Sequence, residues 1–166
     1  MSDPFRLRVL KAMTATLKSV TIENGYVHDL SMAVFRGRDD FGDDDPLPLV
    51  SILEHPDALD TTQAKNDSGA INPFRLLVQG FVKDDPENPT DPAYHLVADV
   101  ITALVKEKKK DRGRNIFDLG YGENCVSDFS IGQPVCRPAD GVNSSSSFFW
   151  MTVTLDLIED LENPFA

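Results

Sequence analysis

The sequence predicts an α+β domain in which two helices pack on one face of a mainly antiparallel sheet. Two segments, near residues 4–20 and 91–110, carry apolar side chains at helical spacing. Five further segments have the alternating or continuous apolar character of strands. The expected order is α-β-β-β-α-β-β, and helices on one face of such a sheet are the natural packing. A length of 166 residues fits a single domain, 1–166, with a sizeable core.

The first predicted helix starts after Asp3, whose residue type favours helix N-caps, with Pro4 at the first helical position. The pair Asn24-Gly25 is a stop signal beyond its end. The apolar residues that share one face of this helix are Phe5, Val9, Ala12, Met13, Leu17 and Val20.

Three strands are expected next, at residues 26–36, 47–55 and 74–83. The middle one is apolar on both faces, which is typical of a central strand. Between the first two lies the segment 37–46, with five acids, two glycines and no apolar face, so it is expected to be a solvated loop. The polar segment 56–72 is a second loop, and loops of this length are often functional or disordered.

The stretch DDPENPTDP, residues 84–92, combines four acids with three prolines and is expected to form a structural corner. Proline ends the preceding strand because it cannot donate to the sheet ladder. Thr90 or Asp91 caps the second helix, and Pro92 occupies its first position. Acids at the start of this helix and lysines at its end both match the helix dipole. Its apolar face consists of Ala93, Leu96, Val97, Val100, Ile101, Leu104 and Val105.

The last two strands are expected at residues 125–131 and 149–157, and the second of them alternates most clearly. The segment 132–147 between them is expected to be a long loop that ends in four serines, Ser144–Ser147.

The charge of the chain limits its partners. With a formal net charge of −11, the chain should repel a nucleic-acid backbone, because phosphate binding requires clustered lysine and arginine. No apolar run reaches the roughly 18 residues of a membrane-spanning helix. The N-terminal residues lack the basic and apolar blocks of a signal peptide. Cys125 and Cys136 are expected to be free thiols in a reducing compartment.

No motif in the sequence predicts catalysis, a cofactor or a metal. The three histidines share no metal-ligand spacing, and DDFGDDDPLPLV lacks the glycine and glutamate of an EF-hand loop. Gly120-Tyr121-Gly122 lacks the third glycine of a dinucleotide fingerprint. Cys125 has no Cys-His signature, and the serine run has no G-x-S-x-G context. Weak cation binding by the acidic loop is the alternative to simple solvation there.

Four stretches carry a family resemblance, and they occur in the family's order over most of the chain. They are FRLRVLKAMTATLKSV, VFRGRDDFGDDDPLPLVSILEHP, LLVQGFVKDDPENPTDPAYHLVADV and FFWMTVTLDLIEDLENPFA. Together they resemble the tail terminator (tail completion) proteins of tailed bacteriophages. None of the four is a catalytic motif, so the likeness is one of pattern and order.

The resemblance implies a structural virion protein with no enzyme activity and no cofactor. It implies a hexameric ring of identical subunits that caps the tail tube and meets the head-side connector. The expected partners are therefore further copies of the chain, the tail tube protein and the head-side connector protein. The protein would assemble in the host bacterial cytoplasm and reside in the tail or neck of the virion. The alternatives are a head-tail connector or neck protein and, from a different class, a small cytosolic enzyme.

The candidate lumen or interface surface is the acidic loop with the two arginines before it. DNA must pass through such a ring without tight binding, and an acidic wall permits this because it releases no counterions from the duplex. The alternative is that the loop faces bulk solvent and keeps the free subunit soluble. The candidate residues are Arg36, Arg38, Asp39, Asp40, Asp43, Asp44 and Asp45.

Overall fold

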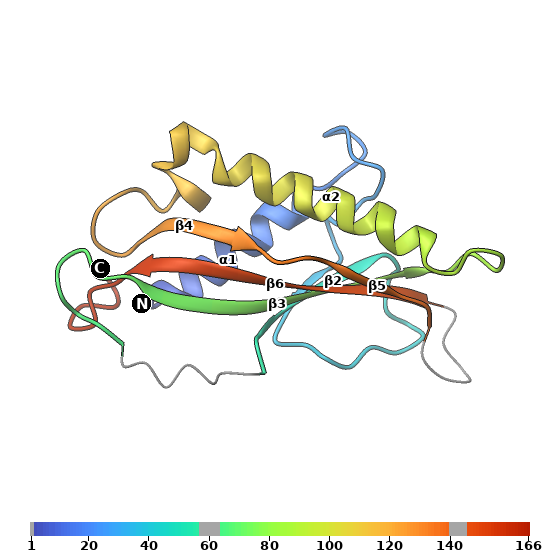
Figure 1. The fold of residues 1–166 in the computed structure, drawn as a ribbon, viewed down its shortest axis with the longest axis horizontal. Coiled ribbons are helices and arrows are strands. Elements are labelled where there is room, and N and C mark those ends of the chain that lie inside the picture. The colour runs from blue at the N-terminus through green and yellow to red at the C-terminus, as the bar shows by residue number, and fades with distance from the viewer. Residues whose placement is uncertain (1, 57–63, 140–145) are drawn as a thin grey trace.

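The computed structural model describes residues 2–56, 64–139 and 146–166, and these form an α+β fold, as the sequence predicts (Figure 1). Two helices accompany a six-stranded, mostly antiparallel sheet. The elements are α1 (Phe5–Lys18), β1 (Val34–Arg36), β2 (Leu49–Glu54), β3 (Asn72–Lys83), α2 (Asp91–Lys108), the short turns η1 (Lys110–Gly113) and η2 (Ile116–Asp118), β4 (Cys125–Ile131), β5 (Val135–Arg137) and β6 (Ser146–Ile158).

The sheet is built around its two longest strands, β3 and β6. The strand order is β1-β2-β3-β6-β4, and β5 also pairs with β6. β3 and β6 run antiparallel from Asn72 opposite Leu157 to Lys83 opposite Ser146. β1 and β2 pair in parallel, whereas every other described pair is antiparallel. The centre of the sheet therefore joins the third strand of the sequence to the last.

Both helices pack on the same face of this sheet and share one core with it. Phe5, Val9 and Met13 of α1 and Leu96 and Leu104 of α2 are at most 2% exposed, which confirms the two predicted apolar faces. Figure 1 shows α2 running along the length of the sheet, with both chain termini at one end of the molecule.

A glycine allows the tightest contact in the centre of the sheet. Gly80 on β3 lies opposite Phe149 on β6, and the ring of Phe149 is fully buried. A Cβ atom added to Gly80 would lie 2.1 Å from Cε1 of that ring. The absence of a side chain at Gly80 therefore creates the space that the Phe149 ring fills.

The predicted strand at residues 26–36 is largely wrong. Only its last three residues form β1, and the segment before them folds as turns. The Asp99 carboxylate on α2 accepts hydrogen bonds from the backbone N–H groups of Val27 and His28, at 3.0 and 2.9 Å. Leu30 is fully buried beside this anchor. Residues 26–33 therefore form a loop that is anchored to α2 and to the core, and their loose apolar alternation comes from that packing instead of from a strand.

Three smaller expectations also change. Asp3 does not cap α1; Pro4 occupies the N-cap position, and the Asp3 carboxylate lies 2.6 Å from Nζ of Lys11. The predicted loop at 132–147 contains β5, and its last two serines belong to β6. Residues 57–63 and 140–145, which belong to the two predicted long loops, lie outside the described residues.

The corner at residues 84–92 confirms the structural interpretation of its acids. Thr90 is the N-cap residue of α2, although its side chain makes no capping bond, and Pro92 lies in the first turn. The Asp85 carboxylate accepts hydrogen bonds from the backbone N–H groups of Glu87 and Asn88, at 2.8 and 2.9 Å. These two bonds close the turn locally.

Candidate functional site

The acidic loop that follows β1 is closed by one arginine. Nη2 of Arg38 lies 2.8 and 2.7 Å from the two carboxylate oxygens of Asp45. The backbone N–H of Gly42 donates to the same carboxylate at 2.8 Å. The Gly42 bond, followed by the Arg38 contact, lowers the pKa of Asp45 below its usual value. The loop is thus held by its own first and last charged side chains.

A row of aromatic rings lies beneath this loop, and sequence reasoning missed it. The successive ring centroids are 6.0, 5.4, 5.9 and 5.7 Å apart. The guanidinium of Arg38 lies over the first two rings, at 4.8 and 4.9 Å from their centroids. All of these rings are half-buried. In order, the row is Phe35, Phe41, Phe81, Phe148 and Trp150.

This aromatic row lies on the sheet face that carries no helix. Phe149 and Met151 of β6 are buried in the core shared with the helices. Because side chains alternate along a strand, Phe148 and Trp150 point to the opposite face. Phe41 comes from the acidic loop, so the loop is seated on this helix-free face through its aromatic side chain. The alternation in β6 could have revealed the face, but not the loop that covers part of it.

The structure brings only two of the seven predicted site residues into contact, Arg38 and Asp45. Arg36 points to the other side, where its Nη1 donates to Oγ1 of Thr14 on α1 at 3.1 Å. The remaining four acids are exposed on the outside of the loop. They are Asp39, Asp40, Asp43 and Asp44. The predicted surface is therefore a clamped loop with an acidic rim.

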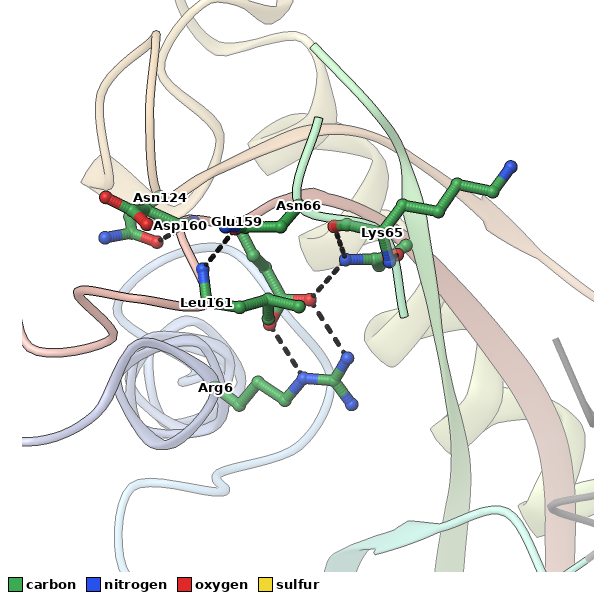
Figure 2. Close-up of polar contacts among 8 residues, drawn as sticks. Arg6, Lys65, Asn66, Asn124, Glu159, Asp160 and Leu161 are labelled. Carbon is green, nitrogen blue, oxygen red and sulfur yellow. Dashed lines mark hydrogen bonds and ion pairs between the residues drawn. The ribbon is translucent and has the colours of Figure 1, made fainter. Parts of the chain in front are cut away.

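A second polar cluster gathers at the end of the molecule where the termini lie (Figure 2). The Glu159 side chain is only 5% exposed. It accepts hydrogen bonds from Nε and Nη2 of Arg6 at 2.8 and 3.0 Å, and from Nδ2 of Asn72 at 3.0 Å. The bond to Glu159 raises the pKa of Arg6 above its usual value. Both oxygens of the Glu159 carboxylate have a partner, so this cluster, which we call the Glu159 clamp, ties together α1, β3 and the segment after β6.

A hollow of about 410 Å³ lies beside this clamp, and its lining includes Asp67, Tyr121, Glu123 and Asp160.

Across residues 2–56, 64–139 and 146–166, no three His, Cys, Asp or Glu side chains are grouped as a metal site requires. None of the described helices is long and apolar enough to span a membrane.

One histidine and both cysteines have surroundings that the structure defines. Nδ1 of His28 lies 2.8 Å from the Asp99 carboxylate, within the anchor of the 21–33 segment. Cys125 is buried and its thiol contacts the backbone oxygen of Gly122 at 3.0 Å. Burial raises the pKa of the Cys136 thiol, which favours its protonated and less nucleophilic form.

No family model matches this sequence, and no curated protein matches it either. The surfaces described above are then the basis for a functional proposal. The most distinctive of them is the helix-free face, with its aromatic row and the acidic loop clamped over it.

One carboxylate in the sheet is placed unfavourably. Asp156 on β6 pairs with Asp128 on β4, so two acids face each other across strands. Burial, followed by the charge of Asp128, raises the pKa of Asp156. A raised native-state pKa means that folding favours the protonated form, so stability is lost as the pH rises through that pKa.

Replacing Asp156 with asparagine is therefore expected to raise the free energy of unfolding at neutral pH by about 0.2–1 kcal/mol, the range for a partly screened like-charge pair. The gain should shrink at acidic pH, where the carboxyl of the original protein takes up its proton. Urea melts at both pH values measure this. The matched control is Asp40→Asn, which removes an exposed acid and should change little. A gain that is equal at both pH values would contradict the electrostatic explanation.

Proposed function

We propose that this chain is a structural subunit of a tailed-bacteriophage particle, a tail terminator that forms a hexameric ring. The ring would cap the tail tube and join it to the head-side connector. The observation that carries the proposal is the acidic loop, which the ion pair of Arg38 and Asp45 closes over the aromatic row of the helix-free face. The resemblance of the four sequence stretches to that family supports the same function.

The clamped loop suits a protein that works by contacting other subunits through its surface. A rigid scaffold that carries loops is the usual arrangement for recognition surfaces. The loop carries four exposed acids, and a wall of this charge would let DNA slide past without tight binding. The partly exposed aromatic row offers apolar area for contact with a tube or connector subunit, since aromatic residues are enriched at interfaces.

Two measurements test this function. Native mass spectrometry of the purified protein at high concentration should reveal a closed oligomer of six subunits, because a head-to-tail contact that does not close makes filaments. Electron microscopy of particles with a gold label on this chain should place the label at the head-proximal end of the tail tube. A label within the connector, away from the tube, would favour a neck protein instead. Monomers in the assembled particle would contradict the ring, and particles without any label would reopen the cytosolic enzyme alternative.

A further inference from the structure

The two ends of α2 carry opposite charge. Six of the 16 lysines and arginines of the chain fall between residues 106 and 114, at its C-terminal end and in η1. Four acids fall between residues 84 and 91, at its N-terminal end. Figure 1 shows these two segments at opposite ends of the helix, which runs along the longest axis of the molecule. The helix and its two flanking segments are thus electrically polarised, although the net charge of the chain is −11.

The basic end contains a hollow. We call it the basic hollow; its volume is about 510 Å³, and its lining includes Lys108, Lys109, Arg112, Ile116, Ser127 and Asp128. Lys108 is already engaged, since its Nζ donates to the backbone oxygen of Phe129 at 2.6 Å and lies 3.1 Å from Asp128. Lys109 and Arg112 are exposed, and neither side chain has an acidic partner in the described part of the chain. Two cations of the hollow are therefore free to receive an anionic group.

The acidic end is a stiff projection. We call residues 84–91 the acidic turn; Pro86 and Pro89 lie within it, and Pro92 follows directly. The two backbone hydrogen bonds to Asp85 fix its shape and also lower the pKa of that carboxyl. Glu87 and Asp91 are exposed, and Asp84 is half-buried. A projection that is already ordered loses little conformational entropy when it binds, so it can dock at a low entropic cost.

We propose that the acidic turn of one copy of this chain docks into the basic hollow of the next copy. The contact would be head-to-tail, because the two surfaces lie at opposite ends of the same molecule. It would pair the free Lys109 and Arg112 of the basic hollow with Asp84 and Glu87 of the acidic turn. A nucleic acid suits the basic hollow less well, because its phosphates would face the field of a chain with 27 acids and 16 bases. The contact itself requires no virion, but closure into a ring rests on the proposed function.

Two charge-neutralising variants test the contact. Lys109→Gln with Arg112→Gln disables the hollow, and Asp84→Asn with Glu87→Gln disables the turn. Asp85 is left intact because its carboxylate closes the turn. Sedimentation at low salt should show that the wild type self-associates, that each variant alone stays monomeric, and that an equimolar mixture forms a dimer. The mixture stops at a dimer because only one productive turn–hollow pair remains between the two variants.

Matched controls remove equal charge elsewhere. Lys18→Gln with Lys65→Gln, and Glu23→Gln with Glu162→Gln, replace exposed residues outside both surfaces and should self-associate like the wild type. Added salt should weaken the wild-type contact, since exposed charges are screened beyond about 10 Å at 0.1 M ionic strength. Circular dichroism melts of all four variants confirm that each is folded.

Several outcomes would overturn the contact. They are a wild type that stays monomeric at high concentration and low salt, variants that associate normally, and a mixture that forms no dimer. A hollow variant that self-associates but loses affinity for a duplex oligonucleotide would identify a nucleic-acid site instead. The two proposals also separate from each other. Rings that persist in both variants would refute the turn–hollow contact and leave the proposed function intact. A dimer in the equimolar mixture, together with no gold label at tail ends, would support the contact and refute the proposed function.

Discussion

Replacing Leu104 with alanine is expected to lower the free energy of unfolding by about 2–5 kcal/mol, the usual range for a buried leucine. Leu104 is fully buried in the core that α2 shares with the sheet. The smaller side chain would leave a cavity that the close-packed surroundings can fill only in part.

Urea denaturation measures this loss, with Thr102→Ala as the control. Thr102 lies on the exposed side of the same helix, so its replacement should change stability by less than about 0.5 kcal/mol. A loss for Leu104→Ala as small as that of the control would mean that α2 does not pack on the sheet at this position.

Replacing Arg6 with alanine is expected to cost about 1.5–3 kcal/mol, the range for hydrogen bonds to charged groups. The change leaves the Glu159 carboxylate, only 5% exposed, without its ionic partner. Asn72 would then be its remaining hydrogen-bond donor. The estimate lies below the loss for a fully buried pair, because the Arg6 side chain is 45% exposed and water can replace part of its contact.

The same helix supplies a matched control for this ion pair. Lys11 and Asp3 are joined at 2.6 Å, but their side chains are 48% and 36% exposed. Lys11→Ala should therefore cost no more than about 1 kcal/mol, as surface pairs do. A double-mutant cycle of Arg6→Ala with Glu159→Gln isolates the coupling energy between Arg6 and Glu159. Equal losses for Arg6→Ala and Lys11→Ala would show that burial of Glu159 does not matter.

The sequence predicted the elements whose signals are local and repeated. α2 has an uninterrupted apolar face with proline at its start, and β6 alternates between half-buried and buried side chains along its length. The strand predicted at 26–36 was largely wrong because the apolar residues before β1 belong to a loop that packs on the core. Its anchor, Asp99, lies more than seventy residues away on α2, and no local pattern signals such a contact.

The candidate surface was predicted only as a charged segment. Its composition indicated exposure, and Asp39, Asp40, Asp43 and Asp44 are indeed exposed. The clamp between Arg38 and Asp45 depends on how the loop turns back, and the aromatic row depends on strand register. Register joins residues that are distant in the sequence, such as Phe81 and Phe148, and the periodicity of single strands does not encode it.

The pairing of β3 with β6 governs when this chain can fold. Residues 72–83 emerge from the ribosome long before residues 146–158, yet each of these strands is the other's central neighbour. Until β6 has been made, β4 and β5 lack their partner in the sheet, and the core beneath α2 lacks the buried side chains of β6. Contacts between such distant segments carry a loop-closure cost that slows folding. The nascent chain therefore cannot complete its sheet until the last strand is synthesised. Until then its apolar strands stay exposed to other chains.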